Sequence, residues 1–298
     1  MKRSIRNVAR AAIVTALMTT SAAAGTSAGA STAPPIRNAF TRPQSGLRVG
    51  DGSPRLQYWG GAVIANVNIV VVLWGSGRYT AQVTRTAAPN ISTFFAAAAA
   101  SPYVDWLREY NPRGFKIGRG TVRGRVTITP APANDGRQID DVVNIRPELL
   151  RQIRAGRLPK PDANTLYAIF FPAGPVISQG GHDSVTGFCA YHNTVRYRGA
   201  VNVRYAVLPA TAATRKCGPA PGFANLTIAA SHELVEAITD PDVGLASKLG
   251  PPLGWYDPLN GEIADICAGM PATLSAPDGR TYTVQKLWSN RRHACVAS

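Results

Sequence analysis

His232, Glu233 and Glu236 are the residues whose types and spacing could do chemistry in this sequence. They lie in a segment, 225–239, whose apolar residues recur at helical spacing, and Pro241 predicts that the helix ends just before it. Residues four apart share one face of a helix, so the His232 imidazole and the Glu236 carboxylate would stand one turn apart. An imidazole nitrogen and a carboxylate oxygen are both zinc ligands, at about 2.0–2.2 Å. Glu233 would point about 100° away around the helix axis.

The arrangement His232-Glu233-x-x-Glu236 resembles the zincin helix motif His-Glu-x-x-His. The resemblance implies that His232 and Glu236 hold zinc and that Glu233 is the general base. The ion would lower the pKa of its bound water toward ~7, and Glu233 would accept the proton of that water. This sequence departs from the motif at Glu236, because a carboxylate replaces the second His. A negatively charged ligand lowers the charge at the metal and weakens its Lewis acidity.

An acid-rich stretch downstream of the helix is the expected source of a third ligand. Glu262 and Asp257 are the first candidates, because short apolar segments around them could pack this loop under the helix. Asp240 lies eight residues beyond His232, about 12 Å along a continuous helix, which is too far to share a zinc ion with it. Further candidate ligands are Asp265, His182 and His192. The same oxygen-rich stretch could instead bind calcium, which takes six to eight oxygen ligands.

Each candidate also has an ordinary structural explanation. His232 could be a hydrogen-bonded core histidine, Glu233 and Glu236 could face arginines, and the aspartates beside Pro and Gly could form turns. Three hypotheses therefore stay open: a zinc-dependent peptidase or other hydrolase, a non-catalytic module with a structural calcium or zinc site, and no metal. The sequence has no Gly-x-Ser-x-Gly nucleophile elbow and no phosphate-binding glycine loop that would favour another reaction.

The N-terminal residues predict an exported protein. Four basic residues within the first ten precede a short apolar segment, 11–18, and small residues over 21–30, a pattern typical of a signal peptide over 1–30. Residues 31–55 are rich in Pro, Gly and Ser and predict a flexible tether, and 56–298 predicts a single globular domain. No later stretch reaches about 18 apolar residues, so no membrane span is expected. We expect the mature protein to be secreted.

The positive charge of the chain limits its partners. Without 1–30, which holds four basic and no acidic residues, the net charge falls from +15 to +11. The basic residues are scattered and no nucleic-acid-binding motif accompanies them, so nucleic acid is not an expected partner. A peptide or a cell-surface polymer is the expected one. The oligomeric state is not predicted.

Four cysteines lie in the C-terminal half: Cys189, Cys217, Cys267 and Cys295. An even number in an exported chain predicts two disulfides, and three pairings are open. We favour Cys189–Cys217 with Cys267–Cys295, because neighbours in sequence close the shorter loops. A cysteine-ligated metal is the alternative, and no pair has the close spacing typical of one.

Alternating helical and strand patterns predict an α+β fold in which helices pack on a layered sheet, with a zincin-like arrangement. The predicted strands are 62–74, with a hairpin at 66–68 as an option, then 121–129, 165–171, 200–208 and 282–288. The predicted helices are 91–110, 139–154 and 225–239. A glycine- and histidine-bearing loop is expected over 180–192, and a long irregular stretch over 241–277.

Several phrases together resemble secreted bacterial and fungal proteins of unassigned activity and, more distantly, the plant Exordium (phosphate-induced) family. The phrases are Tyr58-Trp-Gly-Gly61, Val72-Leu-Trp-Gly75, Phe188-Cys-Ala-Tyr-His192, Ser231-His-Glu-Leu-Val-Glu-Ala-Ile-Thr-Asp-Pro241, Gly254-Trp-Tyr-Asp257, Gly261-Glu-Ile-Ala-Asp-Ile-Cys267 and Trp288-Ser-Asn290. The resemblance covers most of 56–298. It implies an extracellular or wall-associated protein and no particular reaction.

Overall fold

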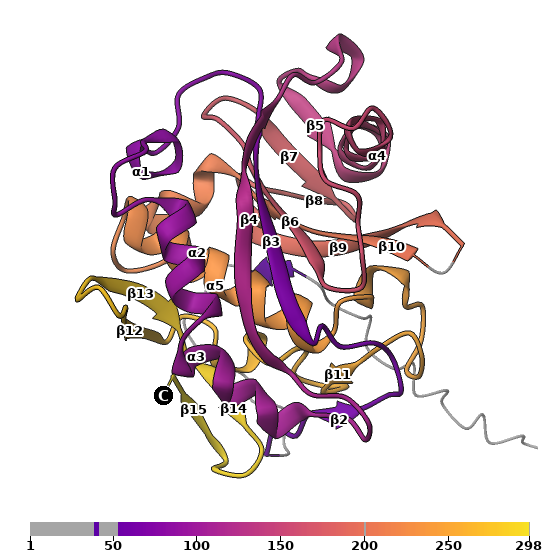
Figure 1. The fold of residues 1–298 in the computed structure, drawn as a ribbon, viewed down its shortest axis with the longest axis vertical. Coiled ribbons are helices and arrows are strands. Elements are labelled where there is room, and N and C mark those ends of the chain that lie inside the picture. The colour runs from indigo at the N-terminus through magenta and orange to yellow at the C-terminus, as the bar shows by residue number, and fades with distance from the viewer. Residues whose placement is uncertain (1–38, 42–52, 200, 298) are drawn as a thin grey trace, which may run out of the picture. The chain divides into compact units, whose positions relative to one another are not determined.

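A six-stranded mixed sheet lies at the centre of the computed structural model, which describes residues 39–41, 53–199 and 201–297 (Figure 1). The strand order is β1-β9-β10-β6-β3-β4. The bounds are β1 Ala39–Thr41, β3 Asn66–Trp74, β4 Gly118–Ile128, β6 Thr165–Phe170, β9 Phe188–Arg198 and β10 Val201–Leu208. Strands β10, β6, β3 and β4 are parallel to one another, whereas β9 runs antiparallel to both β10 and β1.

The central strands are buried on both faces, as their continuous apolar runs predict. In β3, Ile69 and Val71 belong to the core on one face of the sheet, and Val70 and Val72 belong to the core on the other. β6 alternates in the same way. β3 is one continuous strand that begins at Asn66, so the optional hairpin at 66–68 does not form.

Helices cover both faces of the sheet (Figure 1). α5 (Phe223–Thr239) and α2 (Ile91–Ala99) lie on one face, and α4 (Arg146–Arg154) lies on the other. Two short helices, α1 (Ala81–Thr84) and α3 (Pro102–Asp105), flank α2. The structure is therefore a mixed α+β fold.

Two predicted helices differ from the structure at their ends. The helix expected over 91–110 breaks after Ala99, because the Ser101 side chain accepts a hydrogen bond from Tyr103 N and Pro102 begins α3. The chain then continues as a 3₁₀ helix to Tyr110. The helix expected over 139–154 is α-helical only from Arg146. Its first residues belong to β5 (Gln138–Asp140) and to a π-helical turn.

Four small sheets surround the central one. β5 pairs with β7 (Val176–Gln179), which pairs with β8 (His182–Asp183), and β2 (Gln57–Tyr58) pairs with β11 (Trp255–Tyr256). β12 (Pro271–Ser275) pairs with β13 (Thr281–Gln285), and β14 (Leu287–Ser289) pairs with β15 (Ala294–Val296). The predicted strand 282–288 is thus divided between β13 and β14, which belong to different sheets.

β9 corrects the prediction of a loop over 180–192. Its residues pair with β1 on one edge and β10 on the other, and both of its faces are covered over the first seven residues. Tyr191 and Asn193 contact the buried Asp141 on the α4 side of the sheet. His192, between them, faces α5 instead. The sequence analysis missed this strand because its buried polar residues interrupt the apolar pattern by which a buried strand is recognised.

The predicted disulfides are confirmed: Cys189 is joined to Cys217, and Cys267 to Cys295. Two structural disulfides fit a protein of an oxidising compartment. In the described part of the chain no helix is long and apolar enough to cross a membrane.

The predicted signal peptide, 1–30, lies outside the described residues. Parts of the predicted tether, 31–55, are attached to the fold instead. Ala39–Thr41 form β1, and Arg55 N donates to Asp257 Oδ2 at 2.7 Å. The described residues all belong to one compact unit.

Candidate metal centre

α5 carries the residues that the sequence singled out, and it ends at Thr239 as predicted. The helix lies between the central sheet and β13, and its residues from Asn225 to Thr239 are all buried. Its polar residues therefore do not form a solvated face. His232, Glu233 and Glu236 all lie in the protein interior. The alternative in which these carboxylates face surface arginines is wrong.

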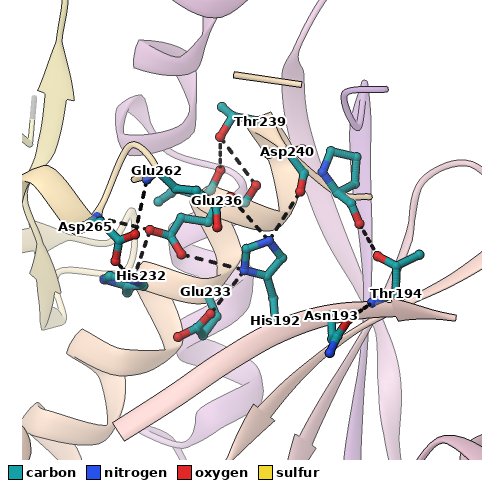
Figure 2. Close-up of polar contacts among 12 residues, drawn as sticks. His192, Asn193, Thr194, His232, Glu233, Glu236, Thr239, Asp240, Glu262 and Asp265 are labelled. Atoms are coloured by element: carbon teal, nitrogen blue, oxygen red, sulfur yellow. Dashed lines mark hydrogen bonds and ion pairs between the residues drawn. The ribbon is translucent and has the colours of Figure 1, made fainter. Parts of the chain in front are cut away.

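Two groups of ligand-type side chains meet at α5 (Figure 2). The Asp265 group consists of His232, Glu236 and Asp265, and the Glu262 group consists of His192, Glu236 and Glu262. The ligand atoms within each group lie within 4.8 Å of one another. Three parts of the chain supply them: α5, β9 and the loop between Asp257 and Cys267, here called the acidic loop. Glu236 belongs to both groups.

In the Asp265 group, one nitrogen of His232 faces two carboxylates. His232 Nε2 lies 3.0 Å from Glu236 Oε1 and 3.5 Å from Asp265 Oδ1. The backbone N–H of Asp265 also donates to Glu236 Oε1 at 3.1 Å. This hydrogen bond fixes the acidic loop directly over the helix.

Gln285 on β13 orients the His232 ring, a role that the sequence analysis did not predict. The Gln285 amide donates from Nε2 to the Ala264 carbonyl at 2.5 Å, which turns its oxygen toward His232 Nδ1 at 3.2 Å. Nδ1 then carries a proton that it donates to Gln285, and Nε2 is the nitrogen that faces Glu236 and Asp265 and would bind a metal ion once its proton is displaced. The Gln285 backbone is also held, because its N–H donates to Ser231 Oγ. A ligand histidine held through its other nitrogen is typical of metal sites.

In the Glu262 group, both nitrogens of His192 face oxygens. Nδ1 lies 3.3 Å from Glu233 Oε2 and 3.6 Å from Glu236 Oε2. Nε2 lies 3.3 Å from the carbonyl oxygen of Asp240 and 3.5 Å from Glu262 Oε1. Figure 2 shows the ring surrounded by these groups.

Buried carboxylate oxygens in this centre accept no hydrogen bond. Glu262 is fully buried and neither of its carboxylate oxygens has a hydrogen-bond partner. Glu236 Oε2 and Asp240 Oδ2 are likewise buried without a hydrogen-bond partner. A buried ionised carboxylate without compensation is strongly unfavourable, so native proteins pair it, protonate it or use it to coordinate a metal.

The electrostatics of the centre show an excess of negative charge. Burial, with repulsion from neighbouring carboxylates, raises the pKa of Glu262 and of Asp240 well above the usual range. Burial also raises the pKa of Glu236 to about 7, although the neighbouring His232 opposes the shift. Burial disfavours the charged form of His232, but the carboxylates of Glu236 and Asp265 outweigh it and raise its pKa well above 6.5. Burial lowers the pKa of His192 to about 4.

The separations between ligand atoms fit a bound metal ion. Ligands at about 2.1 Å in a tetrahedron lie about 3.4 Å from one another. The structure places Glu236 Oε1 and Asp265 Oδ1 at 3.0 and 3.5 Å from His232 Nε2 in the Asp265 group, and Glu262 Oε1 at 3.5 Å from His192 Nε2 in the Glu262 group. Most of these distances are too long for charged hydrogen bonds, which are typically about 2.7–2.9 Å. Imidazole beside carboxylates suits zinc or a similar transition metal, whereas calcium takes oxygen ligands alone.

Two predicted ligands, Asp257 and His182, lie outside both groups, and so does the side chain of Asp240, which was not expected to share the zinc ion of His232. Asp257 was a first candidate, but its carboxylate accepts from Arg55 N, Leu259 N and both Asn260 nitrogens, so it organises the turn of the acidic loop. His182 is exposed on β8. The Asp240 side chain accepts from Gly254 N at 2.7 Å, and only its backbone carbonyl reaches a histidine.

The centre is closed to solvent. Its ligand side chains are fully buried except for Asp265, whose side chain is 13 % exposed. Two surface pockets, one beside α2 and β4 and one beside Pro102 and Trp106, contain no residue of either group. Among the described residues of the two groups, Asp265 is the one whose side chain is partly exposed.

No protein-family model, curated protein or solved structure matches this chain. The assignment of a function therefore rests on the residues of the centre themselves.

Proposed function

We propose that this chain is an exported metalloprotein that binds Zn²⁺ through His232, Glu236 and Asp265 in a zincin-like arrangement. The observation that carries the proposal is the convergence of His232 Nε2, Glu236 Oε1 and Asp265 Oδ1, with the other His232 nitrogen held by Gln285. Two of these ligands come from the helix motif, and the third comes from the acidic loop.

The burial of the centre supports a structural role for the ion. The bound metal would join α5 to the acidic loop, and Asp265 lies two residues before the disulfide at Cys267. Structural zinc contributes directly to folding free energy, since the unfolded chain has no preformed site. In this role the protein is an extracellular or wall-associated module whose partner is a peptide or a cell-surface polymer. The two disulfides and the Exordium-like phrases support that setting.

Hydrolysis of a peptide or related acyl bond is a second candidate function. The ligand set favours it, because three protein ligands with a fourth open position are typical of catalytic zinc. A zinc ion in this centre would supply a polarised, more acidic water. Glu233 would accept the proton of that water, as the zincin-like motif implies. The reaction requires the acidic loop to open on the Asp265 side.

Metal analysis of purified protein tests the proposal. Apoprotein prepared with a chelator is incubated with Zn²⁺, and the bound metal is measured for wild type, His232→Ala, Glu233→Gln and the matched control His182→Ala, an exposed histidine outside the centre. We expect the His232 variant to lose zinc from the Asp265 group while the Glu233 and His182 variants keep it. Equal zinc content in the His232 variant and wild type would overturn the proposal.

A peptidase assay on the same preparations separates the two candidate functions. Hydrolysis of a mixed peptide library by wild type, lost in the Glu233→Gln variant that still contains zinc, supports the enzyme. Zinc-dependent thermal stabilisation without hydrolysis supports the structural role.

A further inference from the structure

We infer that the Glu262 group holds a second divalent transition-metal ion and that Glu236 bridges the two ions, one on each carboxylate oxygen. This inference rests on the proposed zinc site at the Asp265 group and adds a position to it. The second ion would be held by His192, Glu262 and Glu236, with the Asp240 carbonyl close enough to contribute.

The two oxygens of Glu236 face different histidines. Oε1 lies 3.0 Å from His232 Nε2, whereas Oε2 lies 3.6 Å from His192 Nδ1 and accepts no hydrogen bond. Carboxylates that join two metal ions, about 3.5–4 Å apart, present their oxygens in this way. One ion bound to Oε1 would leave the Oε2 side of the carboxylate uncompensated.

His192 presents one ring nitrogen to the acidic groups of the centre in either tautomer. A neutral imidazole has one N–H and one lone pair. If Nδ1 carries the proton and donates to Glu233, the lone pair of Nε2 faces the Asp240 carbonyl and Glu262 Oε1. If Nε2 carries it, the lone pair of Nδ1 faces Glu233 and Glu236. In the first tautomer Nε2 could bind a metal ion beside Glu262, while Glu233 orients the ligand ring through Nδ1.

Glu262 supplies the independent sign of a ligand. Its side chain is fully buried, it points into the group, and neither carboxylate oxygen accepts a hydrogen bond (Figure 2). Among the described residues the ion pairs of Glu236, Glu262 and Asp265 are formed with His192 and His232 and with no Lys or Arg. The five carboxylates of the centre (Glu233, Glu236, Asp240, Glu262 and Asp265) carry, when ionised, more negative charge than one divalent ion offsets.

The donor set defines which ion fits. One imidazole with carboxylate and carbonyl oxygens suits Zn²⁺ or Mn²⁺. Two metals with a bridging carboxylate form the arrangement by which two-metal hydrolases stabilise both the attacking and the leaving oxygen. If the second candidate function is correct, a dinuclear centre would therefore favour two-metal hydrolysis.

Stoichiometry measured by native mass spectrometry and calorimetry tests the inference. Full-length mature apoprotein is titrated with Zn²⁺ alone. We expect two ions per chain in wild type, one in Glu262→Gln and one in Asp265→Asn. The matched control is Glu148→Gln, a buried glutamate on the α4 side of the sheet, which should keep two. Circular dichroism of each variant establishes that it is folded.

The other outcomes separate this inference from the proposed function. One ion per chain that is lost in Asp265→Asn and kept in Glu262→Gln overturns the second position and leaves the proposed function standing. If wild type binds one ion and only Glu262→Gln loses it, both the bridge and the ligand set of the proposed function are wrong. If wild type binds no ion, both the inference and the proposed function are wrong. Two ions that persist in Glu262→Gln also overturn the inference.

Wild-type protein provides a test that needs no variant. Apoprotein loaded with Mn²⁺ alone should give an exchange-coupled electron paramagnetic resonance spectrum, because the carboxylate of Glu236 would join the two ions. A spectrum of isolated Mn²⁺ at full loading would overturn the bridge.

Discussion

Replacing Gln285 should weaken zinc binding although Gln285 touches no metal. In Gln285→Met the acceptor for His232 Nδ1–H is lost, so the ring is free to rotate and to change tautomer. Removing such a supporting hydrogen bond typically lowers metal affinity 10- to 100-fold, which corresponds to about 1.4–2.7 kcal/mol. The variant also loses the hydrogen bond from Gln285 Nε2 to the Ala264 carbonyl, whose length is 2.5 Å in the structure.

Gln285→Glu is the control that separates these two losses. It also lacks the donor to Ala264, but its carboxylate still accepts from His232 Nδ1–H and increases the basicity of the ring. We therefore expect Gln285→Glu to bind zinc at least as tightly as wild type, and Gln285→Met to bind it 10- to 100-fold more weakly. Competition with a chromogenic chelator measures both dissociation constants. Equal affinities for the two variants would refute the positioning role of Gln285.

Three further predictions concern the stability of the fold. Burial would raise the pKa of Glu148, but hydrogen bonds from neighbouring guanidinium and amide groups outweigh it and lower the pKa to about 2. Its stabilising contribution is therefore complete above pH 4.5 and is lost as the pH falls toward 2, so Glu148→Gln should flatten the pH dependence of urea unfolding in that window; an unchanged dependence would contradict this. Replacing Cys267 and Cys295 together by Ala opens a loop with a sequence separation of 28 and should lower the free energy of unfolding by roughly 3–4 kcal/mol, measured by urea denaturation of oxidised wild type and variant. A Cβ at Gly254 would lie 2.3 Å from the backbone oxygen of Thr239 at the end of α5, so Gly254→Ala should cost about 1–3 kcal/mol. At Gly136 a Cβ would meet one backbone oxygen at 4.0 Å, an ordinary contact, so Gly136→Ala should change stability by less than about 0.5 kcal/mol.

The sequence alone determined the parts of the protein that depend on short-range patterns. The end of α5 follows from the proline after it, and the buried strands β3 and β6 follow from continuous apolar runs. The relation between His232 and Glu236 follows from the period of the helix, because residues four apart share a face wherever the helix is placed. The disulfide pairing followed from loop length.

Only the tertiary structure decided which distant groups complete the centre. His192 lies 40 residues from His232 in sequence and belongs to the same centre because α5 packs against β9 on one face of the sheet, a contact that no local pattern encodes. Asp257 and Asp265 look alike in the sequence, but hydrogen bonds within the turn occupy the first and leave the second to face His232. Gln285 had no signal, since a glutamine at a strand end is ordinary until its amide is found between a carbonyl and an imidazole. Spacing along one helix fixes two ligands, whereas the remaining ligands depend on how the sheet, the loop and the C-terminal strands pack around it.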